Sequence, residues 1–136
     1  MILDSSTLLA IVFREPGHEE LLGSIRDAEI VAAGAPTLTE TGIVLEARLG
    51  DRAPGLLERL LDELGVQEIS FGSVHWREAL EAFRRFGKGR HPAALNLGDC
   101  MTYAAARLTG EPLLCVGDDF PRTDLALVRS GDETDG

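Results

Sequence analysis

The chain has 136 residues, of which 44% are hydrophobic and 26% charged, and its formal net charge at pH 7 is −10. This length predicts one domain that buries roughly two thirds of its unfolded surface without a disulfide or a structural metal. The negative charge excludes a protein that wraps duplex nucleic acid with its whole surface, because Lys and Arg supply most of the non-specific affinity for phosphates.

The cysteines and the apolar runs bear on the compartment. Cys100 and Cys115 fall in a helix pattern and a strand pattern without metal-ligand spacing, so we expect two buried thiols in a reducing cytosol. No charged segment followed by an apolar core opens the chain, and no apolar run is long enough to span a bilayer. We therefore expect a cytoplasmic protein with no membrane partner.

Helix and strand patterns alternate along the chain. The expected strands span 1–3, 29–33, 66–71, 113–116 and 125–128. One expected helix follows the caps at 4–7, a second starts at His18 and a third after Pro36. Two more span 53–64 and 73–86, and the last one contains Asp99 and ends before Gly110. This alternation predicts an α/β fold, with a central parallel sheet of four to five strands flanked by helices. We expect one domain over 1–129 and a disordered acidic tail at 130–136.

The apolar faces of two helices carry further predictions. Glu40 shares a face with Ile43, Val44 and Ala47, so we expect it to project from an apolar stripe toward the core. The helix at 73–86 is expected to bury the large side chain of Trp76 together with Ala79, Leu80 and Phe83.

Acidic side chains recur at places that a parallel sheet brings together. Asp4 follows the first strand, Glu40 opens the helix after Pro36, Asp99 lies in the first turn of its helix, and Asp118 and Asp119 end the strand at 113–116. The loops that enter the following helices lie at the same edge as the carboxyl ends of the strands. Gathered carboxylates raise one another's pKa unless a cation neutralises them. Mg²⁺ or Mn²⁺ would do so, and would also support phosphodiester cleavage.

Each acid also has a purely structural interpretation. Asp4 fits an N-cap, Thr37-x-x-Glu40 fits a capping box, Asn96-x-x-Asp99 resembles one, and Asp118 or Asp119 could close a turn. Both interpretations stay open at the level of the sequence.

A local basic excess precedes the helix that carries Asp99. Between His75 and His91 five basic side chains stand against two acidic ones, which leaves an excess of three positive charges. The five are Arg77, Arg84, Arg85, Lys88 and Arg90. We expect Arg84, Arg85, Lys88 and Arg90 to guide an RNA backbone toward the acids, although a solvated helix side would carry the same residues.

Four segments together resemble the motifs of PIN-domain ribonucleases, and specifically those of VapC-type toxins. They are M-I-L-D-S-S at the start, T-L-T-E-T at 37–41, L-N-L-G-D-C at 95–100 and L-L-C-V-G-D-D-F-P-R-T-D at 113–124. The resemblance covers nearly the whole chain, and the order and spacing of the segments make it specific.

This resemblance implies a PIN-like fold and an endoribonuclease that depends on Mg²⁺ or Mn²⁺. Asp4, Glu40 and Asp99 match the family's first three acids, with Asp4 and Asp99 as the usual metal ligands and Ser6 as a supporting hydroxyl. The fourth acid is Asp118 or Asp119, which are adjacent here where the family has a wider spacing. The resemblance further implies a homodimer and an inhibitory VapB-type antitoxin.

Two other classes of function compete with this one. A dehalogenase-type phosphatase or a receiver domain also places an Asp after its first strand, but the phosphatase needs a second Asp where this chain has Ser6. Both also need a lysine after a late strand, and Lys88 is not so placed. A non-enzymatic module whose acids bind an Arg-rich partner is the other alternative.

Overall fold

The computed structural model describes residues 1–128 and contains a four-stranded sheet in which every strand pair is parallel. The order of the strands is β3-β2-β1-β4. The strands are β1 (Ile2–Leu3), β2 (Val31–Gly34), β3 (Val66–Ile69) and β4 (Leu113–Leu114). The helices are α1 (Ser5–Val12), α2 (His18–Asp27), α3 (Ala35–Leu49), α4 (Ala53–Leu64), α5 (Ser73–Phe86) and α6 (Leu97–Thr109). Two short 3₁₀ helices, η1 (Gly50–Arg52) and η2 (Phe120–Arg122), complete the described elements.

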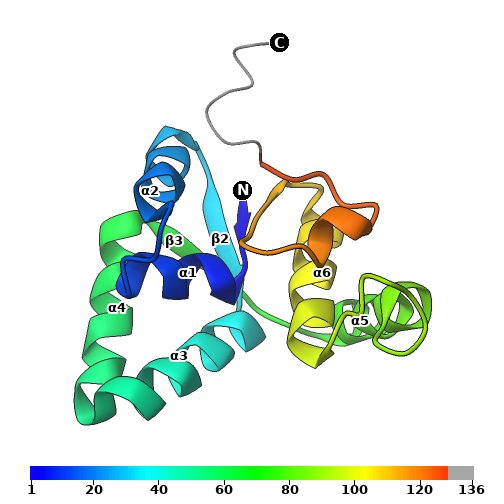
Figure 1. The fold of residues 1–136 in the computed structure, drawn as a ribbon, viewed down its shortest axis with the longest axis horizontal. Helices are drawn as coiled ribbons and strands as arrows, with labels where there is room; N and C mark the ends of the chain where they lie inside the picture. The colour runs from blue at the N-terminus through cyan, green and yellow to red at the C-terminus, as the bar shows by residue number, and fades with distance from the viewer. Residues whose placement is uncertain (129–136) are drawn as a thin grey trace.

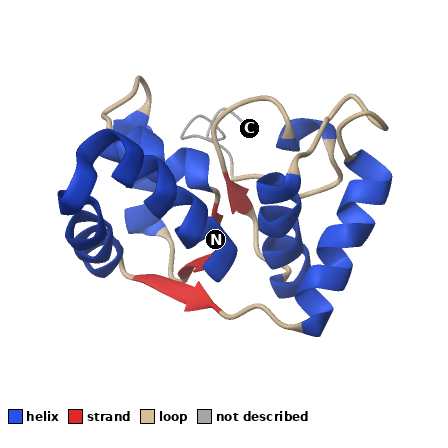
Figure 2. Ribbon diagram, turned by 90° about the horizontal axis from the view of Figure 1, so that it is seen from below, coloured by secondary structure: helices blue, strands red, loops and turns tan. Residues whose placement is uncertain are grey.

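The central strand β1 separates two apolar cores. Successive side chains of a strand point to opposite faces of a sheet. Leu3 therefore packs with Leu8 and Ile25 on the side of α1 and α2, whereas Ile2 packs with Phe86 and Tyr103 on the side of α5 and α6. Figure 1 shows the strands between these two groups of helices, and Figure 2 shows the same division after a quarter turn. The predicted α/β class with a parallel sheet is confirmed.

Local signals set the helix ends close to the predicted positions. Gly65 and Gly110 follow α4 and α6 with φ of 67° and 73°, in the left-handed region that a residue with a Cβ avoids. No helix of residues 1–128 is both long enough and apolar enough to cross a membrane.

Every predicted strand is shorter in the structure, and β3, for example, ends at Ile69 rather than at Phe71. The prediction for 113–116 was too long because the Val116 backbone N–H donates to the Ser6 hydroxyl at 3.0 Å instead of joining a strand ladder. The predicted strand at 125–128 is a single parallel bridge between Leu127 and Leu113. With β4 only two residues long, a partner strand has little to pair with. The predicted tail at 130–136 lies outside the described residues.

The prediction for the buried face of α5 was partly wrong. Ala79, Ala82 and Phe86 are the buried side chains of α5, whereas Trp76 and Leu80 are 51% and 45% exposed. Small alanines let α5 approach α6 closely, and the larger apolar side chains remain at the rim of that contact.

Candidate active site

Asp4 follows β1 at the carboxyl edge of the sheet, and only 5% of the residue is exposed. Its Oδ2 accepts the Ser6 backbone N–H at 3.1 Å and the Ser6 hydroxyl at 2.6 Å, and its Oδ1 accepts the Thr102 hydroxyl at 2.9 Å. The capping interpretation is confirmed, because Asp4 is the N-cap of α1. A carboxylate has about four lone-pair sites, so a fourth donor or a cation can still bind.

Ser6 connects Asp4 to the neighbouring strand. Its Oγ donates to Asp4 and accepts the Val116 backbone N–H just beyond β4. The Asp4 backbone N–H in turn donates to the Leu114 carbonyl at 3.1 Å. The carboxylate of Asp4 is thus held at the point where the carboxyl ends of β1 and β4 meet.

Asp99 lies in the first turn of α6 and forms the predicted capping box with Asn96. Its Oδ2 accepts the Asn96 backbone N–H at 3.1 Å, and Asn96 Oδ1 accepts the Asp99 backbone N–H at 2.9 Å. Burial raises the pKa of Asp99 to about 6; the Asn96 bond opposes this shift, while the charges of Asp4, Asp119 and Glu40 add to it. Capping and an acidic cluster therefore coexist at this residue.

Glu40 reaches from α3 toward the first turns of α1 and α6. The Ser5 hydroxyl donates to Glu40 Oε1 at 3.0 Å. The carboxylate also lies directly over Gly98, where an added Cβ would come within 2.6 Å of Oε2. Any side chain at position 98 would therefore displace Glu40, and this glycine allows the carboxylate to lie beside the first turn of α6.

The capping box predicted for Glu40 was wrong, and so was the apolar stripe in which Glu40 was placed, although Glu40 itself is half-buried. Gly34 is the N-cap of α3, so Thr37 and Glu40 form no capping box. The buried side chains of α3 are Thr37, Thr41 and Leu45, and Ile43 of the predicted apolar stripe is 66% exposed. Threonines can occupy the buried positions because their hydroxyls are hydrogen-bonded there.

The turn after β4 carries Asp118 and Asp119, which are both exposed. The charge of Asp119 raises the pKa of Asp99, and it also contributes to the pKa of about 12 that burial mainly gives Cys115. Asp118 is not among the groups that shift either pKa. Of these two acids, Asp119 is therefore the one whose charge acts on Asp99.

Two buried hydroxyls complete the surroundings of Asp4, and sequence reasoning missed them. Thr102, which is fully buried, donates to Asp4 and lies 3.0 Å from the hydroxyl of Thr37, which is 2% exposed. Thr37 is the first residue of the segment T-L-T-E-T, and Thr102 lies two residues after the segment L-N-L-G-D-C. Only the long-range contact between α3 and α6 shows that they meet.

The predicted RNA-binding side chains differ in their availability. Arg85 is engaged, since its Nη2 lies 3.0 Å from Asp124 Oδ2 and its guanidinium carbon 4.8 Å from the centre of the Phe86 ring. Arg84 forms an exposed pair with Glu81 at 3.3 Å, and Arg90 lies over the ring of Phe83. Within residues 1–128 Lys88 forms no ion pair.

Asp124 joins the turn after β4 to α5 and α6. Its Oδ1 accepts the Tyr103 hydroxyl at 2.7 Å, and its Oδ2 lies 3.0 Å from Arg85 and 3.5 Å from Arg107. Burial opposes ionisation of Asp124, but the bonds from Tyr103 and Arg85 and the charge of Arg107 outweigh it and lower the pKa. Asp124 is therefore a structural anchor for the turn that carries Asp119.

The donors at this edge suit a hard cation. They are carboxylate and hydroxyl oxygens, and within residues 1–128 none of the acids Asp4, Glu40, Asp99 and Asp119 forms an ion pair. No three Asp, Glu, His or Cys side chains in that range converge on one metal position. Asp99 and Glu40 bond to Asn96 and Ser5 instead. Mg²⁺ usually binds through one or two carboxylates plus waters, so the residues present fit such an ion.

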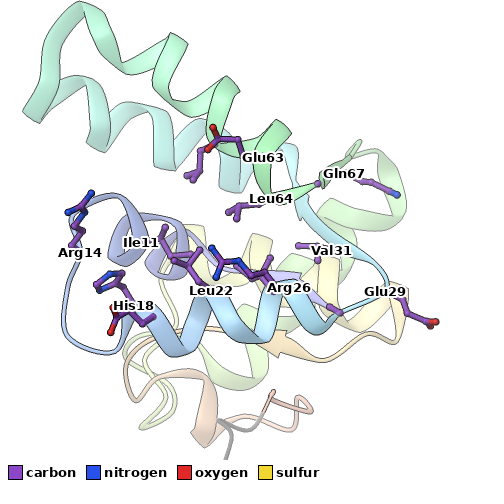
Figure 3. A pocket seen from close by; sticks show the side chains of 15 residues that line it. Ile11, Arg14, His18, Leu22, Arg26, Glu29, Val31, Glu63, Leu64 and Gln67 are labelled. Atoms are coloured by element: carbon purple, nitrogen blue, oxygen red, sulfur yellow. The ribbon is translucent and has the colours of Figure 1, made fainter.

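A large hollow lies elsewhere on the molecule, between α1, α2 and α4 (Figure 3). It measures about 1020 Å³, and Ile11, Leu22 and Leu64 are among its apolar lining. None of the predicted site residues lines it, so the acids and this hollow are separate features.

Comparison with known proteins adds a family to this geometry. Residues 1–125 match the family model of the PIN domain. Ribonuclease VapC36 of Mycobacterium tuberculosis is 48% identical over 126 residues, which are 92% of this chain and 91% of that protein. Among solved structures, Mycobacterium tuberculosis VapC20, described as a toxin that cleaves the Sarcin-Ricin loop, has a TM-score of 0.76 and 19% identity, covering 94% of this chain and 98% of that one. VapBC2 of Rickettsia felis, solved with a DNA fragment from its promoter, has a TM-score of 0.75 and 13% identity, covering 96% and 98%.

Proposed function

The chain belongs to the PIN-domain family and to its VapC-type ribonucleases, and on this premise we propose that it is a metal-dependent endoribonuclease. The observation that carries the proposal is the enclosed carboxylate of Asp4 beside Asp99, whose pKa the charges of Asp4, Asp119 and Glu40 help to raise. Clustered carboxylates raise one another's pKa by repulsion. Because these acids have no ion-pair partner among residues 1–128, a bound cation would relieve that repulsion. Family membership also removes the phosphatase and receiver interpretations.

We propose Mg²⁺ or Mn²⁺ as that cation, held by Asp4 and Asp99. When bound, such an ion supplies an activated water and stabilises the developing charge on the leaving oxygen. The chain's own residues prepare the site for it. Ser6 fixes the Oδ2 of Asp4, and the Asn96 backbone N–H fixes the Oδ2 of Asp99. Because both carboxylates are already oriented, little side-chain entropy is lost when the cation binds.

Glu40 and Asp119 have supporting roles in this proposal. Ser5 holds the Glu40 carboxylate beside the first turn of α6, and Asp124 anchors the turn that carries Asp119. Both acids add negative charge close to Asp99, which raises its pKa and would also attract a divalent cation. Asp118 is proposed to remain in solvent.

RNA is proposed to approach over the basic residues at the end of α5 and in the loop that leads to α6. Lys88, Arg84 and Arg90 lie on the exposed surface, and their charge offsets the repulsion between phosphate and the acids. Arg85 contributes less in this proposal, because Asp124 already neutralises it.

We also propose two protein partners. Solved relatives of the fold include VapBC2 and a toxin-antitoxin complex from Klebsiella pneumoniae, so an inhibitory VapB-type antitoxin is the expected partner. A second copy of this chain is proposed to cover the groove of about 350 Å³ between α5 and α6. There Trp76, Leu80 and Leu97 are 51%, 45% and 73% exposed, and such an apolar patch is typical of a protein interface.

Incubation of the purified, antitoxin-free chain with total RNA tests the activity. Discrete cleavage products should form with Mn²⁺ or Mg²⁺ and vanish in excess chelator. If neither metal supports cleavage, the acids are better explained as a non-enzymatic surface for an Arg-rich partner.

A further inference from the structure

The buried hydroxyls of Thr102 and Thr37 form a chain that ends on Asp4. Thr102 Oγ1 lies 2.9 Å from Asp4 Oδ1 and 3.0 Å from Thr37 Oγ1. The three residues come from α6, α3 and the end of β1, and they are 0%, 2% and 5% exposed. A hydrogen-bond chain that joins three elements in a water-poor interior is stronger than the same bonds at the surface.

The donor direction along this chain is fixed by chemistry. A hydroxyl has one proton and a charged carboxylate only accepts, so Thr102 gives its proton to Asp4. Thr102 must therefore accept from Thr37, whose hydroxyl becomes the first donor of the chain. The order Thr37 to Thr102 to Asp4 leaves the first two hydroxyls satisfied and orients the carboxylate in one way.

The other threonines inside these helices behave differently. Thr41 donates to the Thr37 carbonyl at 2.8 Å and Thr109 to the Ala105 carbonyl at 2.8 Å, each within its own helix. This local bond is available to any helical threonine. Thr102 and Thr37 instead direct their hydroxyls across to another element, so their placement serves Asp4 rather than their own helices.

We infer that Thr102 and Thr37 are positioning residues for the reaction, which together hold Asp4 so that its open lone pair faces the metal. The inference rests on the proposed function, because it takes Asp4 as a metal ligand. Partners that hydrogen-bond a ligating side chain orient it, and their loss typically weakens metal binding or activity about 10- to 100-fold. Neither threonine touches the substrate or the ion in this account.

The test measures Mn²⁺ affinity by calorimetry and metal-free melting for a set of matched variants. Thr102→Val keeps the shape and removes the hydroxyl, so the Mn²⁺ dissociation constant should rise by about 10- to 100-fold. Thr102→Ser keeps the donor and should bind Mn²⁺ like the parent. Thr37→Val should weaken binding less, and the double variant should weaken it by less than the product of the two single effects.

Thr41→Val is the control, since it removes an equally buried hydroxyl of α3 that bonds only to its own helix. It should change the melting temperature but not the Mn²⁺ dissociation constant. An unchanged affinity in Thr102→Val, or an equal loss in Thr41→Val, overturns the inference. If Thr102→Val does not fold, Thr37→Val against Thr41→Val gives the same comparison.

RNA cleavage is measured separately on the same proteins. A parent that binds Mn²⁺ but cuts no RNA refutes the proposed function and leaves the positioning of Asp4 to be judged from the affinities. A parent that binds no Mn²⁺ overturns both.

Discussion

The Asp99 carboxylate accepts the backbone N–H of Asn96 at 3.1 Å and so closes the first turn of α6. The charges of Asp4, Glu40 and Asp119 raise the pKa of this same carboxylate. A capping acid and a metal-binding acid are often treated as alternatives. Here one side chain can do both, because each carboxylate oxygen has two lone pairs and the capping bond uses only one.

Substitution of Asp99 by Asn separates these two roles. Asn96 is the N-cap of α6 and Asp99 its third residue, where an Asn can still accept the Asn96 backbone N–H through its amide oxygen. Removing a charge from the cluster relieves repulsion, so metal-free Asp99→Asn should melt at or above the temperature of the parent. RNA cleavage should fall by orders of magnitude, because the amide supplies no negative charge. Thermal melting and a cleavage rate decide the matter, and a variant that cuts RNA normally would reduce Asp99 to a cap.

The pKa of Asp99 predicts how the stability of the metal-free protein depends on pH. Because its folded-state pKa is about 6, above the ordinary 3.8, the folded state binds more protons than the unfolded state between these values. Protonation of Asp99 therefore stabilises the folded state at low pH, and this stabilisation is lost as the pH rises through about 6.

Melting of the parent and of Asp99→Asn from about pH 4 to about pH 8 isolates this contribution. The melting temperature of the parent minus that of the variant should fall as the pH rises. Saturating Mn²⁺ should reverse the trend, since the metal binds only the ionised carboxylate. A difference that does not vary with pH would mean that Asp99 titrates normally.

Substitutions of the neighbouring residues Arg84 and Arg85 are predicted to change different properties, RNA binding in the first case and stability in the second. Arg84→Ala should leave melting unchanged and lower the slope of log affinity against log salt by about 0.7 for single-stranded RNA. Arg85→Ala should lower the melting temperature, because it leaves Asp124 without its closest cation. Filter binding over a salt series and thermal melting measure the two effects. If the Arg84 variant has the same salt slope as the parent, Arg84 is a solvated residue of α5 that makes no contact with RNA phosphates.

The apolar groove between α5 and α6 predicts a dimer that one substitution breaks. Leu97→Asp places a charge at the most exposed large apolar side chain of residues 1–128 and should convert the dimer to a monomer. Leu108→Asp is the control, because Leu108 is on the same helix, is 43% exposed and does not line the groove. Light scattering after gel filtration measures the mass. A parent that is already monomeric, or a Leu97→Asp variant that stays dimeric, would contradict the assignment of this interface.

Local chemistry explains which parts of the structure could be predicted from the sequence. The ends of α4 and α6 follow from Gly65 and Gly110, and the caps of Asp4 and Asp99 follow from residues two or three positions away. The gathering of the acids at one edge follows from the parallel order of the strands. Each of these features depends on short-range sequence or on a general rule of the fold.

Features that depend on long-range packing were missed or mistaken. Thr102 meets Asp4 across 98 positions of sequence, and no local pattern indicates this contact. Trp76 has the hydrophobicity of a core residue, yet α5 packs through its alanines and leaves the ring half exposed. The buried face of α3 was misjudged for a related reason, because it consists of the hydrogen-bonded Thr37 and Thr41 together with Leu45, whereas the prediction followed the apolar residues Ile43, Val44 and Ala47.

The most direct test of the acidic metal site compares two curves measured on the same protein. One is the binding of Mn²⁺ to the RNA-free chain, and the other is the initial rate of RNA cleavage as a function of Mn²⁺ concentration, each for the parent and for Asp4→Asn. We predict that the rate of the parent rises over the concentrations at which Mn²⁺ binds, and that Asp4→Asn abolishes both binding and cleavage while the chain remains folded. Cleavage at the parent's rate by Asp4→Asn, or in excess chelator, would contradict the account.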